Sequence, residues 1–114
     1  MSESMEQILF VNWMRKTHKE HRIFHIPNGG HRNKATASKL KAEGVSAGVP
    51  DLFIPSLRLF IEMKDLKGVV SPAQKEWLEY LASVGYSVAV CRCFEDAKLL
   101  ILEFVQLNIK KMKK

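Results

Sequence analysis

Two short apolar runs with a proline between them constrain the fold of this chain most strongly. The runs cover residues 51–54 and 58–64, and Pro55-Ser56 separates them. Apolar runs of this length are typical of β-strands, and a short break that contains proline predicts a turn. We therefore expect the two runs to pair as a β-hairpin.

The segments on either side of the hairpin alternate between helical and strand-like patterns. Strands are expected over residues 22–26 and 86–91, and helices over residues 3–19, 33–43, 72–84 and 95–108. The order of elements is then α-β-α-β-β-α-β-α. This order predicts an α/β fold in which a mixed central sheet is flanked by helices.

Serine and glutamine mark two of the predicted helix starts. Ser4-x-x-Gln7 and Ser71-x-x-Gln74 both match the capping box, in which the serine caps the first turn and the glutamine returns the contact. Pro72 suits the first helical position of the second of these helices. The capping patterns therefore support the helix starts expected near residue 3 and at residue 72.

The charge balance of the chain favours a polyanionic partner. Lys and Arg number 18 against 12 Asp and Glu, which gives a formal net charge of +6. Nucleic acid is the most common partner of such a chain, because each phosphate that a cation neutralises releases condensed counterions. The same charge also aids solubility, so it does not identify the partner by itself.

The length of the chain predicts one domain without a membrane span. A chain of 114 residues suits a single domain over residues 1–114, with a core over residues 3–108 and a basic tail over residues 109–114. No run reaches the roughly 20 apolar residues that cross a bilayer. The acidic N-terminus does not resemble a signal peptide, so we expect a cytoplasmic protein.

Charged residues inside the two apolar runs indicate a reaction centre. Successive side chains of a strand point to opposite faces, so Glu62 and Lys64 share one face. Asp51 begins the other strand of the hairpin, where the turn brings it opposite the Glu62 region. Two carboxylates then converge beside one ammonium group. An ordinary surface ion pair between a carboxylate and Lys64 would explain the same pattern.

Two buried carboxylates are stable together only when a cation or hydrogen bonds compensate their charge. Mg²⁺ suits this role, because it binds oxygen ligands, keeps several waters and shares its remaining positions with phosphate oxygens. We expect Asp51 and Glu62 to bind it, with the main-chain carbonyl of Met63 as a third ligand and Mn²⁺ as a substitute ion. Lys64 would orient the attacking water or stabilise charge on the phosphate.

The same residues resemble those of a known nuclease family. Three motifs carry the resemblance, in segments 48–51, 62–64 and 71–74, and Trp77 and Leu81 follow the third. Together they look like the VRR-NUC domain, the virus-type replication and repair nuclease branch of the PD-(D/E)xK superfamily. The resemblance covers nearly the whole domain. The chain is similar to the small stand-alone versions that occur in phages and bacteria.

This resemblance implies a restriction-endonuclease-like core with a metal-dependent nuclease site. It assigns Asp51 and Glu62 to the metal and Lys64 to catalysis, and it implies an acid on the first helix that helps to hold a metal or its waters. Glu6 is the preferred acid and Glu3 its competitor, because spacing alone does not decide between them. Stand-alone members act on branched DNA such as four-way (Holliday) junctions, often as homodimers, which implies DNA and a second copy as partners.

The resemblance also implies roles for residues outside the metal site. It places Gln74 near the catalytic lysine, although helix capping alone would explain this glutamine. Residues expected to contact DNA are Asn28, His31, Arg32, Lys34 and Lys39. The lysines would follow the phosphates, although a solvated helix face explains them equally well.

Other functions are compatible with parts of the pattern. A non-catalytic DNA-binding or assembly module would keep the same fold, although it would have little reason to retain all three charged residues of the hairpin. A nuclease for flaps or other DNA structures would use the same residues. An HNH-type nuclease would use His31 and Asn33, but this sequence lacks the paired histidines expected of that class. The remaining turn histidines, His18 and His21, are expected to be solvated.

Overall fold

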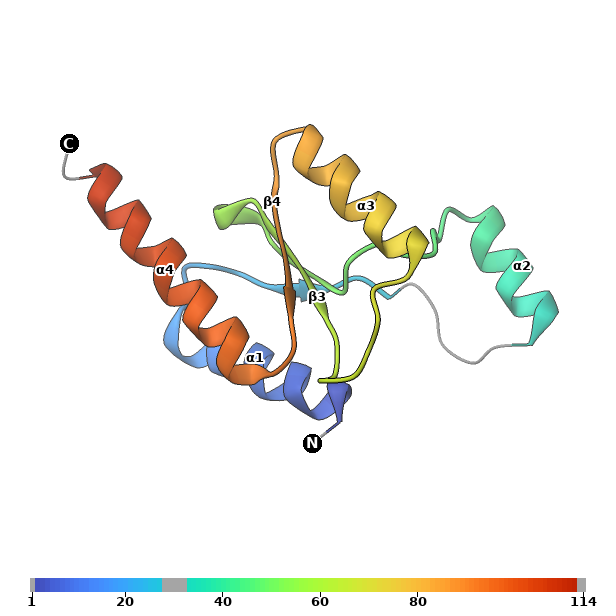
Figure 1. Ribbon diagram of the computed structural model, residues 1–114, viewed down its shortest axis with the longest axis horizontal. Coiled ribbons are helices and arrows are strands. Elements are labelled where there is room, and N and C mark those ends of the chain that lie inside the picture. The colour runs from blue at the N-terminus through green and yellow to red at the C-terminus, as the bar shows by residue number, and fades with distance from the viewer. Residues whose placement is uncertain (1, 28–32, 113–114) are drawn as a thin grey trace.

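The computed structural model describes residues 2–27 and 33–112 as a mixed α/β fold (Figure 1). Its helices are α1 (Glu3–Thr17), α2 (Lys34–Ala42), α3 (Pro72–Ser83) and α4 (Phe94–Met112). Its strands are β1 (Phe24–His25), β2 (Leu52–Ile54), β3 (Leu59–Met63) and β4 (Ser87–Cys91), with a 3₁₀ turn, η1 (Pro55–Leu57), after β2. The predicted order of elements and the α/β fold class are confirmed.

The four strands form one mixed sheet in the order β1-β2-β3-β4. β1, β2 and β3 are antiparallel neighbours, whereas β4 runs parallel to β3. β2 and β3 are the predicted hairpin, in which Phe53 lies opposite Phe60. α3 supplies the long connection that a parallel pair such as β3 and β4 requires.

Helices cover the two faces of the sheet unequally. α1 and α4 pack together on one face, and α3 lies on the other side (Figure 1). Because alternate strand residues point to the same face, every second residue of β2 and β3 is buried against α1 and α4. The buried core consists of Phe10, Met14, Ile23, Leu52, Ile54, Leu57, Leu59, Ile61, Met63, Cys91, Ala97 and Ile101. Glu62 alternates with these core residues and therefore faces α3.

The start of α1 differs from the sequence prediction. The hydroxyl of Ser2 accepts the main-chain N–H of Met5 at 3.1 Å and caps the helix. The predicted capping box Ser4-x-x-Gln7 is therefore wrong, because Ser4 already lies inside the first turn.

The end of α4 also differs from the sequence prediction. The helix runs to Met112 instead of ending at residue 108, so part of the expected basic tail is helical. Lys110 and Lys111 lie in the last turn, where cations stabilise the negative end of the helix dipole. Although α4 is the longest helix, neither it nor any other helix within residues 2–27 and 33–112 is long and apolar enough to cross a membrane.

The predicted start of α3 is confirmed. Ser71 Oγ accepts the main-chain N–H of Gln74 at 3.2 Å, and Gln74 Oε1 accepts the main-chain N–H of Ser71 at 2.8 Å. Pro72 is the first residue of the helix, where its missing N–H costs nothing. This reciprocal pair fixes the side chain of Gln74 at the sheet end of α3.

At Gly48, the main chain of the loop before β2 packs directly against the main chain of the first turn of α3. Its φ is +92°, and a Cβ at this position would lie 2.6 Å from the carbonyl carbon of Ala73 and 2.8 Å from the nitrogen of Gln74. Only glycine combines a left-handed backbone with so close an approach of two main chains. The loop leads directly to Asp51, so this contact fixes where Asp51 lies relative to α3.

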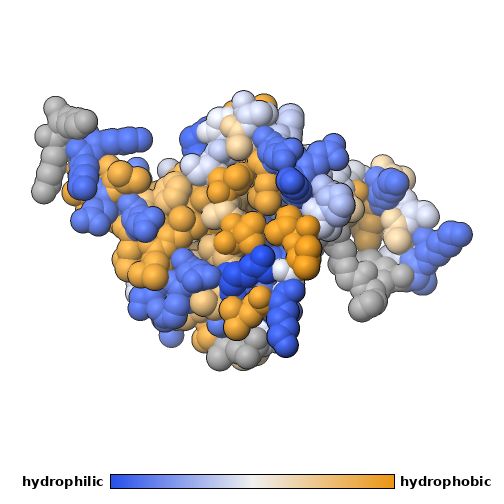
Figure 2. Space-filling view, viewed as in Figure 1, coloured by the Kyte–Doolittle hydropathy of each residue, from blue (hydrophilic) through white to orange (hydrophobic). Residues whose placement is uncertain are grey.

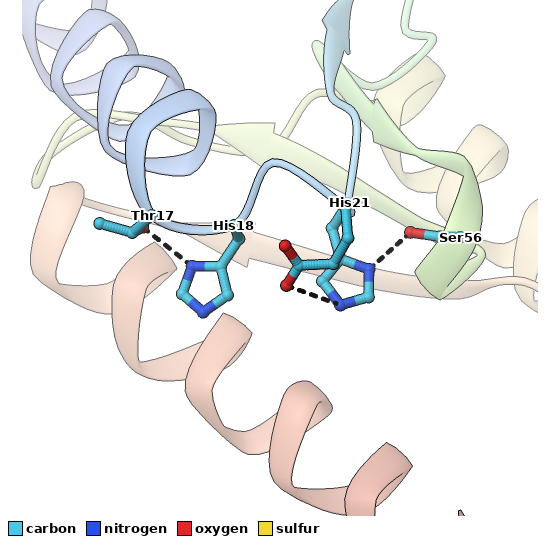
Figure 3. A network of polar contacts seen from close by, with 5 residues as sticks. Thr17, His18, His21 and Ser56 are labelled. Carbon is cyan, nitrogen blue, oxygen red and sulfur yellow. Dashed lines mark hydrogen bonds and ion pairs between the residues drawn. The ribbon is translucent and has the colours of Figure 1, made fainter.

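Histidine contacts hold the turn between α1 and β1 (Figure 3). His21 Nδ1 lies 2.7 Å from Ser56 Oγ, and His18 Nδ1 lies 2.9 Å from Thr17 Oγ1. The expectation of a solvated His21 is wrong, because its side chain is only 15% exposed. Since Ser56 belongs to η1, the contact ties this turn to the tip of the β2–β3 hairpin.

α2 stands apart from the sheet (Figure 1). None of its residues is buried, and Asn33 caps it by accepting the main-chain N–H of Thr36 at 2.8 Å. A helix of nine residues is only marginally stable in water when nothing packs against it, because the first turn is costly to form. Contact with a partner would therefore stabilise α2.

Candidate active site

The register of the β2–β3 hairpin places Asp51 and Glu62 opposite each other. Leu52, the first residue of β2, pairs with Ile61, and this register continued by one residue sets Asp51 opposite Glu62. Asp51 Oδ2 accepts the main-chain N–H of Met63 at 2.9 Å, which holds the carboxylate beside β3. The structure thus brings together the two acids that the hairpin pattern singled out.

Among the described residues, Glu62 is the only charged one that is buried, with 2% of its surface exposed. Its Oε2 accepts a side-chain N–H of Gln74 at 3.3 Å. Burial, followed by the charge of Asp51 and a hydrogen bond to its side chain, raises the pKa of Glu62 from 4.5 to about 8, while Lys64 lowers it. Without a cation, the buried pair of acids therefore favours the protonated form of Glu62 more than an exposed glutamate would.

Lys64 lies two residues beyond Glu62 on the same side of the chain. Its main-chain N–H donates to the carbonyl of Cys91 at 3.0 Å, so the sheet holds the backbone up to this lysine. The residue is half-buried, and its charge lowers the pKa of Glu62 and of Glu3. The ammonium group therefore acts on the same cluster of acids.

The two acids in the first turn of α1 lie in different environments. Burial, and then the charge of Asp51, raises the pKa of Glu3, while Lys64 lowers it. Glu6 Oε1 instead accepts the main-chain N–H of Phe94 at 3.3 Å, at the start of α4. The structure thus brings Glu3 to the acidic cluster, in contrast to the expectation of Glu6. A role for either acid at a cation stays a prediction.

The oxygen atoms around Asp51 suit a hard divalent cation. Two carboxylates converge there. The register of the hairpin, continued beyond Leu52, also sets Met63 opposite Pro50. Because proline has no N–H, it cannot donate a ladder hydrogen bond to the Met63 carbonyl. In the described parts of the chain, no three His, Cys, Asp or Glu side chains form a ready metal-binding group. Mg²⁺ needs only one or two carboxylates, because it keeps several waters. The carboxylate pair with this carbonyl is therefore a donor set that fits such an ion.

The residues expected to contact DNA fall into two groups. Asn28, His31 and Arg32 lie outside the described residues. Lys34 and Lys39 lie on α2 and are exposed. Their positions leave both lysines accessible to a polyanion, and their role in binding stays a prediction.

Arg92 belongs to the surroundings of the site, and sequence reasoning missed it. Its guanidinium donates to the carbonyls of Asp65, at 3.0 Å, and of Gly68, in the connection from β3 to α3. The parallel pairing of β3 with β4 brings the end of β4 beside this connection. No spacing rule links two segments so far apart in the chain.

Glu62→Gln is expected to raise the melting temperature of the cation-free protein at pH 8 by about 4 °C or more, the shift that about 1 kcal/mol gives in a domain of this size. The folded protein binds the Glu62 proton more tightly than the unfolded chain does. The contribution of Glu62 to the free energy of unfolding is therefore greatest below pH 4.5 and falls as the pH rises to about 8.

Thermal unfolding with a chelator, followed by circular dichroism at pH 5 and pH 8, measures this effect. The gain from Glu62→Gln should be much smaller at pH 5, and Glu79→Gln, at an exposed position of α3, should change neither value. Equal melting temperatures for parent and Glu62→Gln at pH 8 would contradict the raised pKa.

The chain is similar to known proteins over almost its whole length. The family model of the VRR-NUC domain matches residues 2–95. A solved structure described as a VRR_NUC domain protein is 32% identical and superposes with a TM-score of 0.78, covering 94% of this chain and 90% of that one. No curated protein sequence matches significantly. The matched stretch contains the β2–β3 hairpin and α3, and the chain therefore belongs to the VRR-NUC domain family.

Proposed function

We propose that this protein is a Mg²⁺-dependent endonuclease, with Mn²⁺ as a substitute ion, that hydrolyses phosphodiester bonds in branched DNA such as four-way junctions. Membership of the VRR-NUC family supports a nuclease-type function on DNA. The observation that carries the proposal is the buried Glu62 opposite Asp51, with Lys64 on the same side of β3. Its substrate would be DNA in the cytoplasm of a bacterial cell or a phage-infected host.

Asp51 and Glu62 would hold the cation, with the Met63 carbonyl beside them. Mg²⁺ bound there would supply Lewis-acid activation of the phosphate and of water. Glu62 has to release its proton to become a ligand, because carboxylates bind metal ions in the ionised form. The raised pKa of Glu62 therefore makes protons compete with the cation below about pH 8.

Lys64 and Gln74 would act on the two sides of Glu62. The Lys64 ammonium group would stabilise the negative charge that develops on the phosphate, or orient the attacking water. Gln74 is a positioning residue, because its Oε1 is held by the N–H of Ser71 while its Nε2 donates to Glu62. One side chain thus caps α3 and orients the carboxylate, so the two interpretations of Gln74 are compatible.

α2 would lie along the DNA backbone. Its exposed lysines, Lys34, Lys39 and Lys41, stand on a helix without an acidic residue in its first turn. Each phosphate that they neutralise would release counterions and stabilise a short helix that has no buried residue. Asn28, His31 and Arg32, which precede α2 in the chain, are proposed to continue this contact.

The parent protein is expected to nick DNA with Mg²⁺ or Mn²⁺ and to stop when a chelator removes the ion. Asp51→Asn and Lys64→Ala should each lower the rate by about 100-fold or more, while DNA affinity in Ca²⁺ stays within about threefold of the parent. Lys75→Ala removes the same charge from an exposed position of α3 and is the control. Electrophoresis of labelled junctions measures cutting, and fluorescence anisotropy measures binding.

Glu3→Gln and Glu6→Gln form a matched pair in the same assay. Glu3→Gln should slow cutting more than Glu6→Gln, because the charges of Asp51 and Lys64 act on Glu3, whereas the Glu6 carboxylate accepts the main-chain N–H of Phe94. Parent-like cutting by Lys64→Ala would contradict the mechanism. DNA binding without any cutting would leave a non-catalytic module on the same fold.

We further propose a homodimer formed through β4, because this strand leaves one edge of the sheet open. In the parallel register, Ser87, Ala89 and Cys91 direct their main-chain groups to β3, so those of Val88 and Val90 point outward. No strand within residues 2–27 and 33–112 pairs with this edge. The edge also lacks the proline, lysine or bulge that protects edge strands of monomeric proteins.

A second copy of the chain fits this edge. Val88 of one copy would pair with Val90 of the other in an antiparallel ladder centred on Ala89, which satisfies the free groups of both strands. A groove of about 270 Å³ between β4 and α4 continues the surface, with Leu99 and Glu103 among its lining residues. Figure 2 shows apolar residues gathered over the face on which β4 and α4 lie.

Val88→Pro should convert the dimer to a monomer. The substitution removes an outward N–H and spares the ladder to β3, because residue 88 directs its main chain away from β3. Val88→Ala keeps the N–H and should remain dimeric. Sedimentation equilibrium at micromolar concentration measures the mass against the 13.0 kDa of one chain. A monomeric parent, or a dimeric Val88→Pro variant, would contradict pairing through β4.

A further inference from the structure

The connection from β3 to α3 carries the two most exposed large apolar side chains of the described residues. Leu66 is 82% exposed and Val69 is 81% exposed, and both lie between Lys64 and Ser71. Isolated apolar residues on a surface need no explanation, but two in a fixed loop beside a candidate active site do.

Hydrogen bonds hold this connection in one shape. Asp65 Oδ1 accepts the main-chain N–H of Lys67 at 2.9 Å, and the N–H of Gly68 donates to the Asp65 carbonyl at 3.3 Å. The Arg92 guanidinium donates to the carbonyls of Asp65 and Gly68 from the end of β4. A loop fixed in this way presents its side chains to a ligand with little further loss of entropy.

The loop also packs against the candidate catalytic lysine. A Cβ on Gly68 would lie 3.3 Å from Cδ of Lys64, so the main chain of the loop contacts the stem of that side chain. At its other end, the loop leads into Ser71, whose main-chain N–H donates to Gln74, and Gln74 in turn donates to Glu62. Both ends of the loop therefore belong to the candidate site, and a DNA strand bound at that site would pass beside it.

We propose that Leu66 and Val69 form an apolar wedge that inserts between DNA bases at a branch point, where the helix is interrupted and bases are easier to unstack. The proposal rests on the proposed nuclease function and says how a branched substrate is recognised. Leucine and similar side chains act as wedges at kinked base steps in other DNA-binding proteins. Insertion has to unstack two bases in either DNA, but it costs less at a branch point, where the helix is interrupted and the bases are held less firmly than in a continuous duplex. The wedge therefore favours branched DNA over a duplex.

The charges around the wedge fit DNA. Lys64 and Lys67 lie on the two sides of Leu66 in the chain, where they would meet phosphates next to the inserted side chains. Asp65 is the only acid of the loop, and its Oδ1 is engaged by the main-chain N–H of Lys67. The phosphates of DNA complement the lysines beside Leu66 better than a second apolar protein surface would.

Fluorescence of 2-aminopurine measures the insertion directly. The parent is mixed in Ca²⁺ with a four-way junction labelled at the branch point, or with a continuous duplex of the same sequence. It should increase the fluorescence of the junction more than that of the duplex. The double variant Leu66→Ser/Val69→Ser should lose this increase and bind the junction about tenfold more weakly, while its duplex affinity stays within about twofold of the parent. Val84→Ser, at another exposed apolar residue, is the matched control and should behave as the parent.

The outcomes separate the wedge from the nuclease function. A folded double variant that keeps junction affinity and fluorescence overturns the wedge, as does one that loses affinity for junction and duplex equally. A double variant whose mass in solution differs from that of the parent assigns the loop to contact between copies and also overturns it. A parent that unstacks the junction but never nicks it with Mg²⁺ overturns the nuclease proposal alone. Nicking without any fluorescence change overturns the wedge alone.

Discussion

The rest of the structure depends on two carboxylates that face each other across neighbouring strands. Asp51 and Glu62 occupy opposite positions of one ladder, and Glu62 is withdrawn from water. Two negative charges placed opposite each other are unfavourable, which raises the pKa of Glu62. Each acid also has a hydrogen-bond donor, the N–H of Met63 for Asp51 and the amide of Gln74 for Glu62. A carboxyl group held with so raised a pKa is typical of a functional site.

The fold positions this pair with rigid elements and leaves substrate recognition to the periphery. The sheet fixes the two acids and Lys64, while the close contact at Gly48 and the capping box of α3 place Gln74 above them. Of the segments proposed to contact DNA or a second copy, α2 and the open edge of β4 lie outside this centre, whereas the connection after β3 borders it at Lys64 and Gln74. Chemistry and substrate choice would therefore depend largely on different parts of the chain.

Local patterns predicted the hairpin and the start of α3, because strand alternation and helix capping involve residues close in sequence. They put Glu62 and Lys64 on one side of β3 for the same reason. The choice between Glu3 and Glu6 was beyond such patterns, since both lie in one helical turn and only the docking of α1 separates them. Arg92 was missed because its contact depends on the parallel pairing of β3 and β4.

A crystal structure with Mn²⁺, located by its anomalous scattering, tests the central claim most directly. We expect an ion bound by a carboxylate oxygen of Asp51, a carboxylate oxygen of Glu62 and the main-chain carbonyl of Met63. Manganese bound only elsewhere, or the two carboxyl groups turned away from each other with no ion between them, would contradict it.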